Sequence, residues 1–230
     1  MYTTISEHFS SAQSITDLKT QLITELVKRN YKLQSVLWGT SFCSDEVNNL
    51  FSPFYDLFAG PGPFHLGGIS GLPFSGITGM NAFLSHVPTH GAAMILYGPH
   101  IGVSRDGTFG QVQRQNQSSP TTCCGSLVAA IESLKHSDLK PMDNLLDYQQ
   151  VRVQQHLYQH RDEILEHSNP IRKATNLTYE AIHHKLLKII DEIKKRRQHF
   201  ELILVGGVVI NTDWTIEDYF DLRNLEFIRF

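Results

Sequence analysis

Hydrophobic residues are arranged along the chain in two patterns, one typical of helices and one typical of buried strands. Residues 11–30 have an apolar residue every three or four positions, which predicts a helix with one buried face. Continuous apolar runs at 36–38, 92–97 and 202–210 are instead typical of strands that are buried on both faces. Residues 227–230 are consistent with an edge strand.

Helical patterns lie between these strand-like runs. An apolar stripe follows Cys124, and residues 142–166 and 178–198 have the pattern of two long helices with polar outer faces. Strands that alternate with helices predict an α/β domain. We therefore expect a central mixed β-sheet flanked by helices, with a helical C-terminal portion. The chain is long enough for one such domain, which we assign to residues 31–230, with residues 1–30 as an N-terminal helical segment.

Residues 58–80 are rich in glycine and proline, and apolar side chains stand between them. A flexible linker has no need for those apolar side chains, so we expect an ordered loop in which the backbone packs closely against other backbone or a ligand. The Gly60-Pro61-Gly62 sequence lacks the third glycine of a dinucleotide-binding loop. No strand is predicted before it either, so we exclude that interpretation.

Composition and charge narrow the function classes. The formal net charge is −3, which gives no field that would favour nucleic acid as a partner. No apolar run has the length of a membrane span, and the first residues lack the pattern of a secretory signal. Three cysteines, two of them adjacent, make a poor disulfide framework. We expect a cytoplasmic protein without nucleic-acid or membrane partners, where a Cys/His set is more often metal-binding or catalytic.

Three residues at the ends of predicted elements form a candidate metal site. Cys43 and His100 follow strand-like runs, and Cys124 precedes a predicted helix. Two thiolates and an imidazole suit Zn²⁺, and three protein ligands leave the fourth position to water, as in catalytic zinc sites. We prefer Cys124 to Cys123 because the N–H groups and dipole at a helix start stabilise a thiolate. The alternative is that the cysteines are inert core residues, which are common.

Asp45 lies two residues after the first candidate ligand. Its carboxylate can reach the same ion or the ion's bound water, although a simple helix N-cap explains it equally well. An ionised aspartate beside a metal needs a cationic or donor partner. Arg105 and Arg114 are the candidates between His100 and Cys124. Surface exposure is the alternative for both, and it is the stronger interpretation for Arg105, which lies beside a predicted turn.

Several of these segments together resemble a known family. They are Cys43-Ser-Asp-Glu46, Phe64–Gly76, Gly98-Pro-His-Ile-Gly102 and Cys124-Gly125. They are similar to the limiting-CO₂-inducible B protein family, which is related in fold and site to the β-type carbonic anhydrases and is also called theta-type. The resemblance covers residues 30–230, and its most specific part is the Gly-Leu-Pro-Phe sequence of the glycine-rich segment.

The resemblance implies a zinc enzyme that forms homodimers with active sites near the interface. Cys43, His100 and Cys124 would be the zinc ligands, and Asp45 would orient the attacking hydroxide. The β-type pattern places an arginine two residues after that aspartate, where this chain has Val47. The arginine must then come from elsewhere in the chain, and we assign Arg114.

The resulting hypothesis is reversible hydration of carbon dioxide to bicarbonate by zinc-bound hydroxide. Carbon dioxide would occupy an apolar pocket lined from the glycine-rich segment, with Leu72 and Phe74 as candidates, and a histidine such as His65, His86 or His90 could move the proton. The alternative is a catalytically silent zinc-binding homologue, with Asp45 as the fourth ligand, that acts as a binding or sensing subunit. A zinc hydrolase of esters or amides is a third hypothesis, disfavoured because no second general acid is evident near the ligands.

Overall fold

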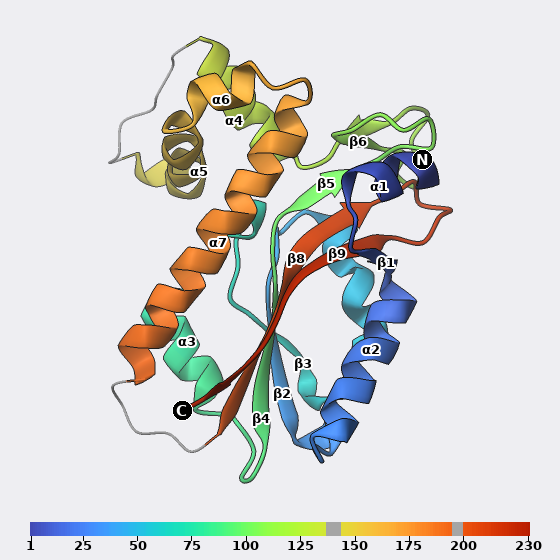
Figure 1. Ribbon diagram of the computed structural model, residues 1–230. Helices are drawn as coiled ribbons and strands as arrows, with labels where there is room; N and C mark the ends of the chain where they lie inside the picture. Colours follow the sequence, from blue (N-terminus) through green and yellow to red (C-terminus); the bar gives the residue numbers. More distant parts are fainter. Residues whose placement is uncertain (137–143, 195–199) are drawn as a thin grey trace.

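A mixed β-sheet of seven strands lies between two layers of helices (Figure 1). The computed structural model describes residues 1–136, 144–194 and 200–230, without the side chains of Leu50 and Ser52. The strand order is β1-β9-β8-β4-β2-β3, and β5 pairs with the far end of β8. The strands are β1 (Ala12–Ser14), β2 (Val36–Ser41), β3 (Ala59–His65), β4 (Ala92–Tyr97), β5 (His100–Gly102), β8 (Glu201–Asn211) and β9 (Tyr219–Arg229). Strands β2, β3, β4, β5 and β8 run parallel, whereas β1 and β9 are antiparallel to their neighbours.

Helices cover both faces of the sheet, and short elements fill the connections. The α-helices are α1 (Tyr2–His8), α2 (Ile15–Lys28), α3 (Gly76–Leu84), α4 (Gly125–Lys135), α5 (Tyr148–Tyr158), α6 (Arg161–Leu165) and α7 (Pro170–Lys194). The 3₁₀ helices are η1 (Leu33–Ser35), η2 (Glu46–Phe54), η3 (Ile69–Gly71) and η4 (Leu145–Asp147), and β6 (Gln111–Val112) pairs with β7 (Thr121–Thr122) in a small ribbon. Within the described ranges, none of these helices combines the length and the apolar character that crossing a bilayer requires.

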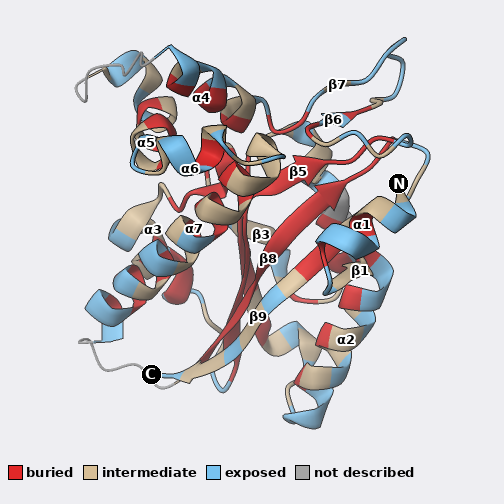
Figure 2. Ribbon diagram, turned by 45° about the horizontal axis from the view of Figure 1, so that its top comes forward, coloured by how far each residue is buried: buried red, intermediate tan, exposed pale blue. Residues whose placement is uncertain are grey.

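Alternate residues of the central strands pack into two separate hydrophobic cores, one on each face of the sheet. In β4, Ala93, Ile95 and Tyr97 pack in the core under α3, α4 and α7, whereas Ala92, Met94 and Leu96 pack in the core under α2. Strand β8 is buried along its whole length (Figure 2), and so is β4. Burying one such side chain stabilises the fold by about 1.5–3 kcal/mol, which explains why these runs contain almost no polar residues. The mixed α/β architecture predicted from the sequence is confirmed.

The N-terminal and C-terminal segments differ in detail from the predictions. The segment 1–30 is helical in α1 and α2, and it also contains β1, which pairs with β9. The predicted strand at 202–210 is confirmed as β8. The edge-strand prediction for 227–230 is confirmed for residues 227–229, which pair with β8, whereas β1 pairs with β9 only at residues 219–221. The strand itself begins much earlier than predicted, at Tyr219. Polar residues interrupt β9, as expected of an antiparallel strand that is only half buried. For this reason the hydrophobic pattern did not predict most of the strand.

The helical portion of the chain is α4 to α7, and the chain ends in two strands rather than in a helix. The helix predicted at 142–166 is two helices, α5 and α6. The helix predicted at 178–198 begins earlier, at Pro170, a residue that fits the first turn of a helix because its missing N–H has no partner there. Positions 142–143 and 195–198 of these predictions lie outside the described residues.

The glycine-rich segment is ordered, as predicted, but it is not a loop throughout. It supplies β3, η3 and the first half of α3. Its glycines permit close backbone packing: a Cβ at Gly71 would lie 2.3 Å from the carbonyl oxygen of Gly98, and a Cβ at Gly67 would lie 2.6 Å from that of Phe42. Side chains would therefore push this segment away from the ends of β2 and β4.

Candidate metal centre

The candidate ligands meet at the edge of the sheet where the parallel strands end. Cys43 follows β2 by two residues, and His100 opens β5 directly after the turn that ends β4. Cys124 is the N-cap residue of α4, whose first turn points at the same edge. The carboxyl ends of parallel strands share one edge of a sheet, which is why residues far apart in the sequence converge here.

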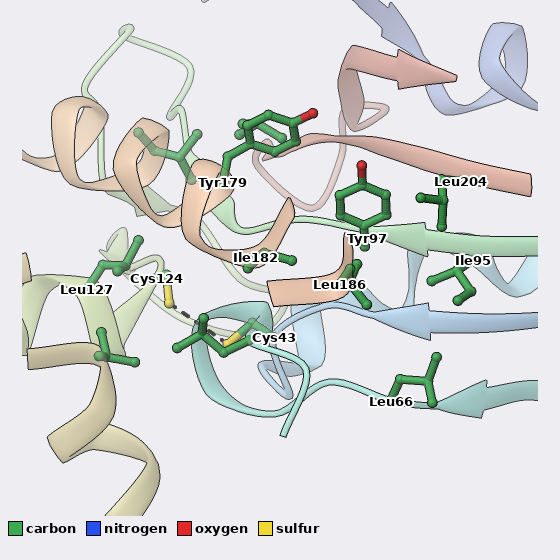
Figure 3. Packing of buried hydrophobic residues seen from close by; sticks show 14 of the residues in the cluster. Cys43, Leu66, Ile95, Tyr97, Cys124, Leu127, Tyr179, Ile182, Leu186 and Leu204 are labelled. Atoms are coloured by element: carbon green, nitrogen blue, oxygen red, sulfur yellow. Dashed lines mark hydrogen bonds between the residues drawn. The ribbon is translucent and has the colours of Figure 1, made fainter. Parts of the chain in front are cut away.

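The three predicted ligands form one compact buried group. The Sγ atoms of Cys43 and Cys124 are 3.9 Å apart and point toward each other (Figure 3). One donor atom from each of Cys43, His100 and Cys124 lies within 4.8 Å of the others. The three residues are 8%, 1% and 1% exposed, respectively. A second group that meets the same distance limit is Asp45, His100 and Cys123. The structure therefore brings the predicted ligands together and places Cys123 beside them.

His100 has one nitrogen paired and one nitrogen free. Its Nδ1 lies 2.8 Å from Oδ1 of Asn211, a hydrogen-bond distance. Its Nε2 is fully buried and has no hydrogen-bond partner among the described residues, and the nearest carboxylate oxygen, Oδ2 of Asp45, is 3.9 Å away. A buried polar atom without a partner costs free energy, so its presence in a native site indicates a ligand. The residues present fit a metal ion at Nε2.

The two thiols are surrounded by backbone donors. The N–H of Ser70 donates to Sγ of Cys43 at 3.1 Å, and Ser70 takes a left-handed conformation (φ 56°) to do so. The hydrogen bond with Cys43 lowers the pKa of Cys124, and N–H groups at the start of α4 lower it further. The pKa of Cys43 is raised by the same hydrogen bond and by burial. One of the two sulfurs is therefore stabilised as an anion, which is the form that binds metals.

The pKa of His100 lies well above its usual value. Burial opposes this shift, but the contacts with the sulfurs of Cys123 and Cys43 outweigh it. Positive charge is thus favoured beside the sulfurs, in agreement with a site built to hold a cation.

Asp45 is held beside this group by an arginine that is remote in sequence. Nη2 of Arg114 donates to both carboxylate oxygens of Asp45, at 3.2 and 3.3 Å. The same guanidinium donates from Nε to Glu46 at 2.6 Å and from Nη1 to Thr121 at 2.6 Å. Hydrogen bonds with Asp45 and with Arg114 lower the pKa of Glu46 to about 2. Of the two arginines considered from the sequence, the structure places Arg114 against Asp45.

Arg105 is exposed and lies elsewhere. Its backbone N–H donates to Asp213 and its guanidinium donates to Thr215.

The carboxylate of Asp45 accepts, besides the hydrogen bonds from Arg114, a long hydrogen bond of 3.4 Å from the N–H of Val47. Its contacts are therefore consistent both with capping the next turn and with a place in the site.

A pocket of about 290 Å³ opens beside Cys43 and Asp45. Thr40, Phe42, Phe51, Pro63, His65 and Gly67 are among its lining residues. Pro63, His65 and Gly67 come from the glycine-rich segment, as predicted, but Leu72 and Phe74 do not line this pocket. Leu72 is buried in the core, and Phe74 packs against Tyr148 and under Lys185. Of the three histidines considered as proton carriers, His65 lines the pocket.

Two contacts of the site were not predicted from the sequence. Ser70 was hidden in the glycine-rich segment, because nothing local shows that its N–H points at a sulfur. Asn211 could have been found from the sequence, because it is a polar residue directly after the buried run 202–210. Cys43 was selected because it too follows a strand-like run. Polar residues at the carboxyl ends of buried parallel strands often line sites.

Comparisons with known proteins identify the family of the chain. Residues 12–229 match the family described as limiting CO2-inducible proteins B/C beta carbonic anhydrases. The chain belongs to this family. Its fold is similar to the crystal structure of PtLCIB4, a homolog of the limiting CO2-inducible protein LCIB, with 29% identity, a TM-score of 0.91, and coverage of 100% of this chain and 96% of that one.

A second similar family structure is that of the limiting CO2-inducible protein LCIB itself, with 19% identity and a TM-score of 0.69, over 96% of this chain and 92% of that one. At that identity the likeness supports the fold alone. A comparison with curated proteins gave no match.

Proposed function

We propose that this member of the family is a zinc-dependent carbonic anhydrase that hydrates carbon dioxide reversibly to bicarbonate. The observation that carries the proposal is the buried, unpartnered Nε2 of His100, a residue grouped compactly with Cys43 and Cys124, with the Asp45–Arg114 pair beside them. Family membership supports the same activity.

The donor set fits zinc better than a hard cation. Two sulfurs bound tetrahedrally to one zinc at about 2.3 Å each would lie about 3.8 Å apart. Cys43 and Cys124 have their sulfurs 3.9 Å apart, which is far longer than a disulfide bond. Thiolates and imidazole also favour zinc over magnesium or calcium, which prefer oxygen ligands. When bound, zinc would supply a water of lowered pKa, about 7, as the nucleophile.

Asp45 and Arg114 have separate tasks in this proposal. The carboxylate of Asp45 would accept a hydrogen bond from the nucleophilic water or hydroxide. This bond would orient the lone pair of the nucleophile toward the carbon atom of carbon dioxide. Arg114 fixes the position of Asp45 through two charge-assisted hydrogen bonds. Glu46, with its pKa near 2, remains an anion and holds the guanidinium from the other side.

The pocket beside Cys43 and Asp45 is the proposed place for carbon dioxide. Its walls combine the rings of Phe42 and Phe51 with polar groups, which suits a small apolar substrate and an anionic product. His65 is exposed at this pocket and contacts Thr40 through Nδ1 at 3.3 Å. It is therefore placed to pass a proton to the buffer.

The proposal is tested by stopped-flow carbon dioxide hydration with purified, zinc-loaded protein at about pH 8, above the expected pKa of the nucleophile. We expect rapid turnover that a chelator abolishes. Cys124→Ser and Cys123→Ser make the same chemical change at adjacent positions and separate the two donor groups. We expect the first variant to lose zinc and activity and the second to retain zinc. Full zinc content and activity in Cys124→Ser would contradict the ligand assignment.

A second candidate function is a silent zinc-binding subunit. It is favoured by the position of Asp45, whose carboxylate meets the same distance limit with His100 and Cys123 as the three predicted ligands do among themselves. As a fourth ligand it would close the site to water. X-ray absorption of the zinc-loaded protein distinguishes the cases, since a closed site has a carboxylate oxygen in place of water. A closed site at alkaline pH, with no hydration activity, would favour this candidate.

We retain two further expectations as predictions. The chain should form a homodimer, which sedimentation equilibrium can test directly. It should reside in a reducing compartment, because all three cysteines are free thiols and two of them are needed as ligands.

A further inference from the structure

We propose that Asn211 is a positioning residue that fixes the tautomer and orientation of His100 for metal binding. This inference rests on the proposed function, because it assumes that Nε2 of His100 is a ligand. Asn211 touches neither substrate nor metal in this proposal, and it acts only through the imidazole.

The backbone around Asn211 is held firmly. It is the last residue of β8, it is fully buried, and it pairs with Gly102 in β5, the strand that begins with His100. Its carbonyl oxygen accepts a hydrogen bond of 2.8 Å from the N–H of Val103. The side chain therefore projects from a fixed point toward the imidazole.

The neighbours of the Asn211 amide decide which way it faces. Its Nδ2 lies 3.2 Å from the carbonyl oxygen of Val47, which can only accept. The NH₂ group must face this acceptor, and the Oδ1 atom then faces Nδ1 of His100 at 2.8 Å.

This orientation determines the tautomer of the neutral imidazole of His100. Oδ1 has no proton to give, so Nδ1 must carry the hydrogen of that bond. The lone pair of a neutral imidazole is then on Nε2, the buried atom that has no partner in the described chain. Outer-shell groups of this kind commonly hold metal-binding histidines in one tautomer and are worth 10–100-fold in metal affinity.

Cys123 is the other neighbour of the same nitrogen, with its Sγ 3.4 Å from Nδ1 and 3.5 Å from Oδ1 of Asn211. A thiol is a weak hydrogen-bonding group. It can donate to Oδ1 together with Nδ1, which leaves the amide as the stronger acceptor for the imidazole.

The test compares zinc affinity, measured by competition with a chelator, between the wild-type protein and three variants. Asn211→Leu keeps the approximate shape and removes the acceptor. Asn211→Asp keeps an oxygen that faces Nδ1. The matched control is Asn224→Leu, since Asn224 is a half-buried asparagine on β9 that donates to Tyr97 and not to the metal group. Circular dichroism and the absorption spectrum of Co²⁺-substituted protein accompany each measurement.

We expect Asn211→Leu to bind zinc about 10- to 100-fold more weakly and to change the Co²⁺ spectrum. Asn211→Asp should bind zinc more tightly than Asn211→Leu, because it keeps an acceptor for Nδ1, although its second oxygen replaces the donor to Val47. Asn224→Leu should lose stability but not zinc affinity.

Wild-type zinc affinity and an unchanged Co²⁺ spectrum in a folded Asn211→Leu variant would overturn the inference. If that variant fails to fold, the smaller substitution Asn211→Ala takes its place, and wild-type zinc affinity in a folded Asn211→Ala variant overturns the inference on the same scale. A wild-type protein that binds zinc but hydrates no carbon dioxide would refute the proposed activity instead, and the affinity comparison would still decide the role of Asn211.

Discussion

Two histidines near the end of β4 show how differently one side chain can be used. His100 pairs Nδ1 with Asn211 and leaves Nε2 buried without a partner among the described residues. His183, on α7, lies 2.7 Å from the hydroxyl of Tyr97, and its ring stacks on those of Tyr97 and Tyr179. The amide of Asn224 donates to the same hydroxyl at 3.0 Å, so the hydroxyl proton is directed to His183.

The difference separates a candidate ligand from a structural histidine. Around His183 the hydroxyl and the amide have partners, and the aromatic rings fill the space, so the cluster needs nothing from outside. Around His100 only Nδ1 is paired, and Nε2 has no partner among the described residues. His183 is half-buried and its Nδ1 has a partner, whereas Nε2 of His100 is fully buried and has none among the described residues.

Removing the two imidazoles should give the largest contrast. We expect His100→Ala to bind zinc at least about 100-fold more weakly than the wild type, since residues behind a ligand are already worth 10–100-fold. His183→Ala should retain zinc. The zinc content of each variant after dialysis is the measurement. Equal zinc content in the two variants would contradict the assignment of His100 as a ligand and His183 as a structural residue.

Arg114 tests whether the group around His100 extends to catalysis. Arg114→Ala should retain zinc but lower kcat/KM for carbon dioxide hydration by about 10- to 100-fold, because it removes charge-assisted hydrogen bonds worth about 1.5–3 kcal/mol. Arg105→Ala, at an exposed arginine, is the matched control and should keep full activity. Stopped-flow hydration at saturating zinc measures both. Loss of zinc in Arg114→Ala would show that the arginine supports the metal group rather than the reaction.

The cluster around His183 should affect stability instead. Tyr97→Phe removes one hydroxyl and leaves groups of His183 and Asn224 without their partner, at a cost of about 1–3 kcal/mol in the free energy of unfolding. Urea denaturation measures the change, and zinc affinity should stay the same. A weakened zinc affinity in this variant would show that the two regions are coupled.

The smallest expected effect is a pH dependence of the free energy of unfolding, which arises from the carboxyl group of Asp218. Burial raises the pKa of Asp218 from 3.8 to about 6. The folded protein holds this proton more tightly than the unfolded chain does. The contribution of Asp218 to the free energy of unfolding is therefore fully present below the unfolded value and is lost as the pH rises through about 6.

Asp218→Asn should remove this decline, so that stability falls less between these two pH values than in the wild type. Urea midpoints measured across the interval test it. Asp162→Asn, at an exposed carboxylate, is the control and should leave the slope unchanged. An unaltered slope in Asp218→Asn would assign the pH dependence to other groups.

Much of the fold follows from local patterns. The runs 36–38, 92–97 and 202–210 became β2, β4 and β8, because a strand buried on both faces tolerates only apolar residues. The stripe of α2 buried four apolar residues on one face. The half-exposed strand β9 was largely missed, since its polar residues serve solvent and pairing partners that the sequence does not show.

Cys43, His100, Cys124 and Asp45 could be named from the sequence because residue type and position at the end of an element restrict their chemistry. That Arg114 rather than Arg105 reaches Asp45, that Ser70 aims its N–H at a sulfur, and that Asn211 faces the imidazole were decided by the tertiary structure alone. These contacts join residues 27 to 111 positions apart. Such pairings depend on how the ends of the parallel strands and the start of α4 meet in space, which no local pattern records.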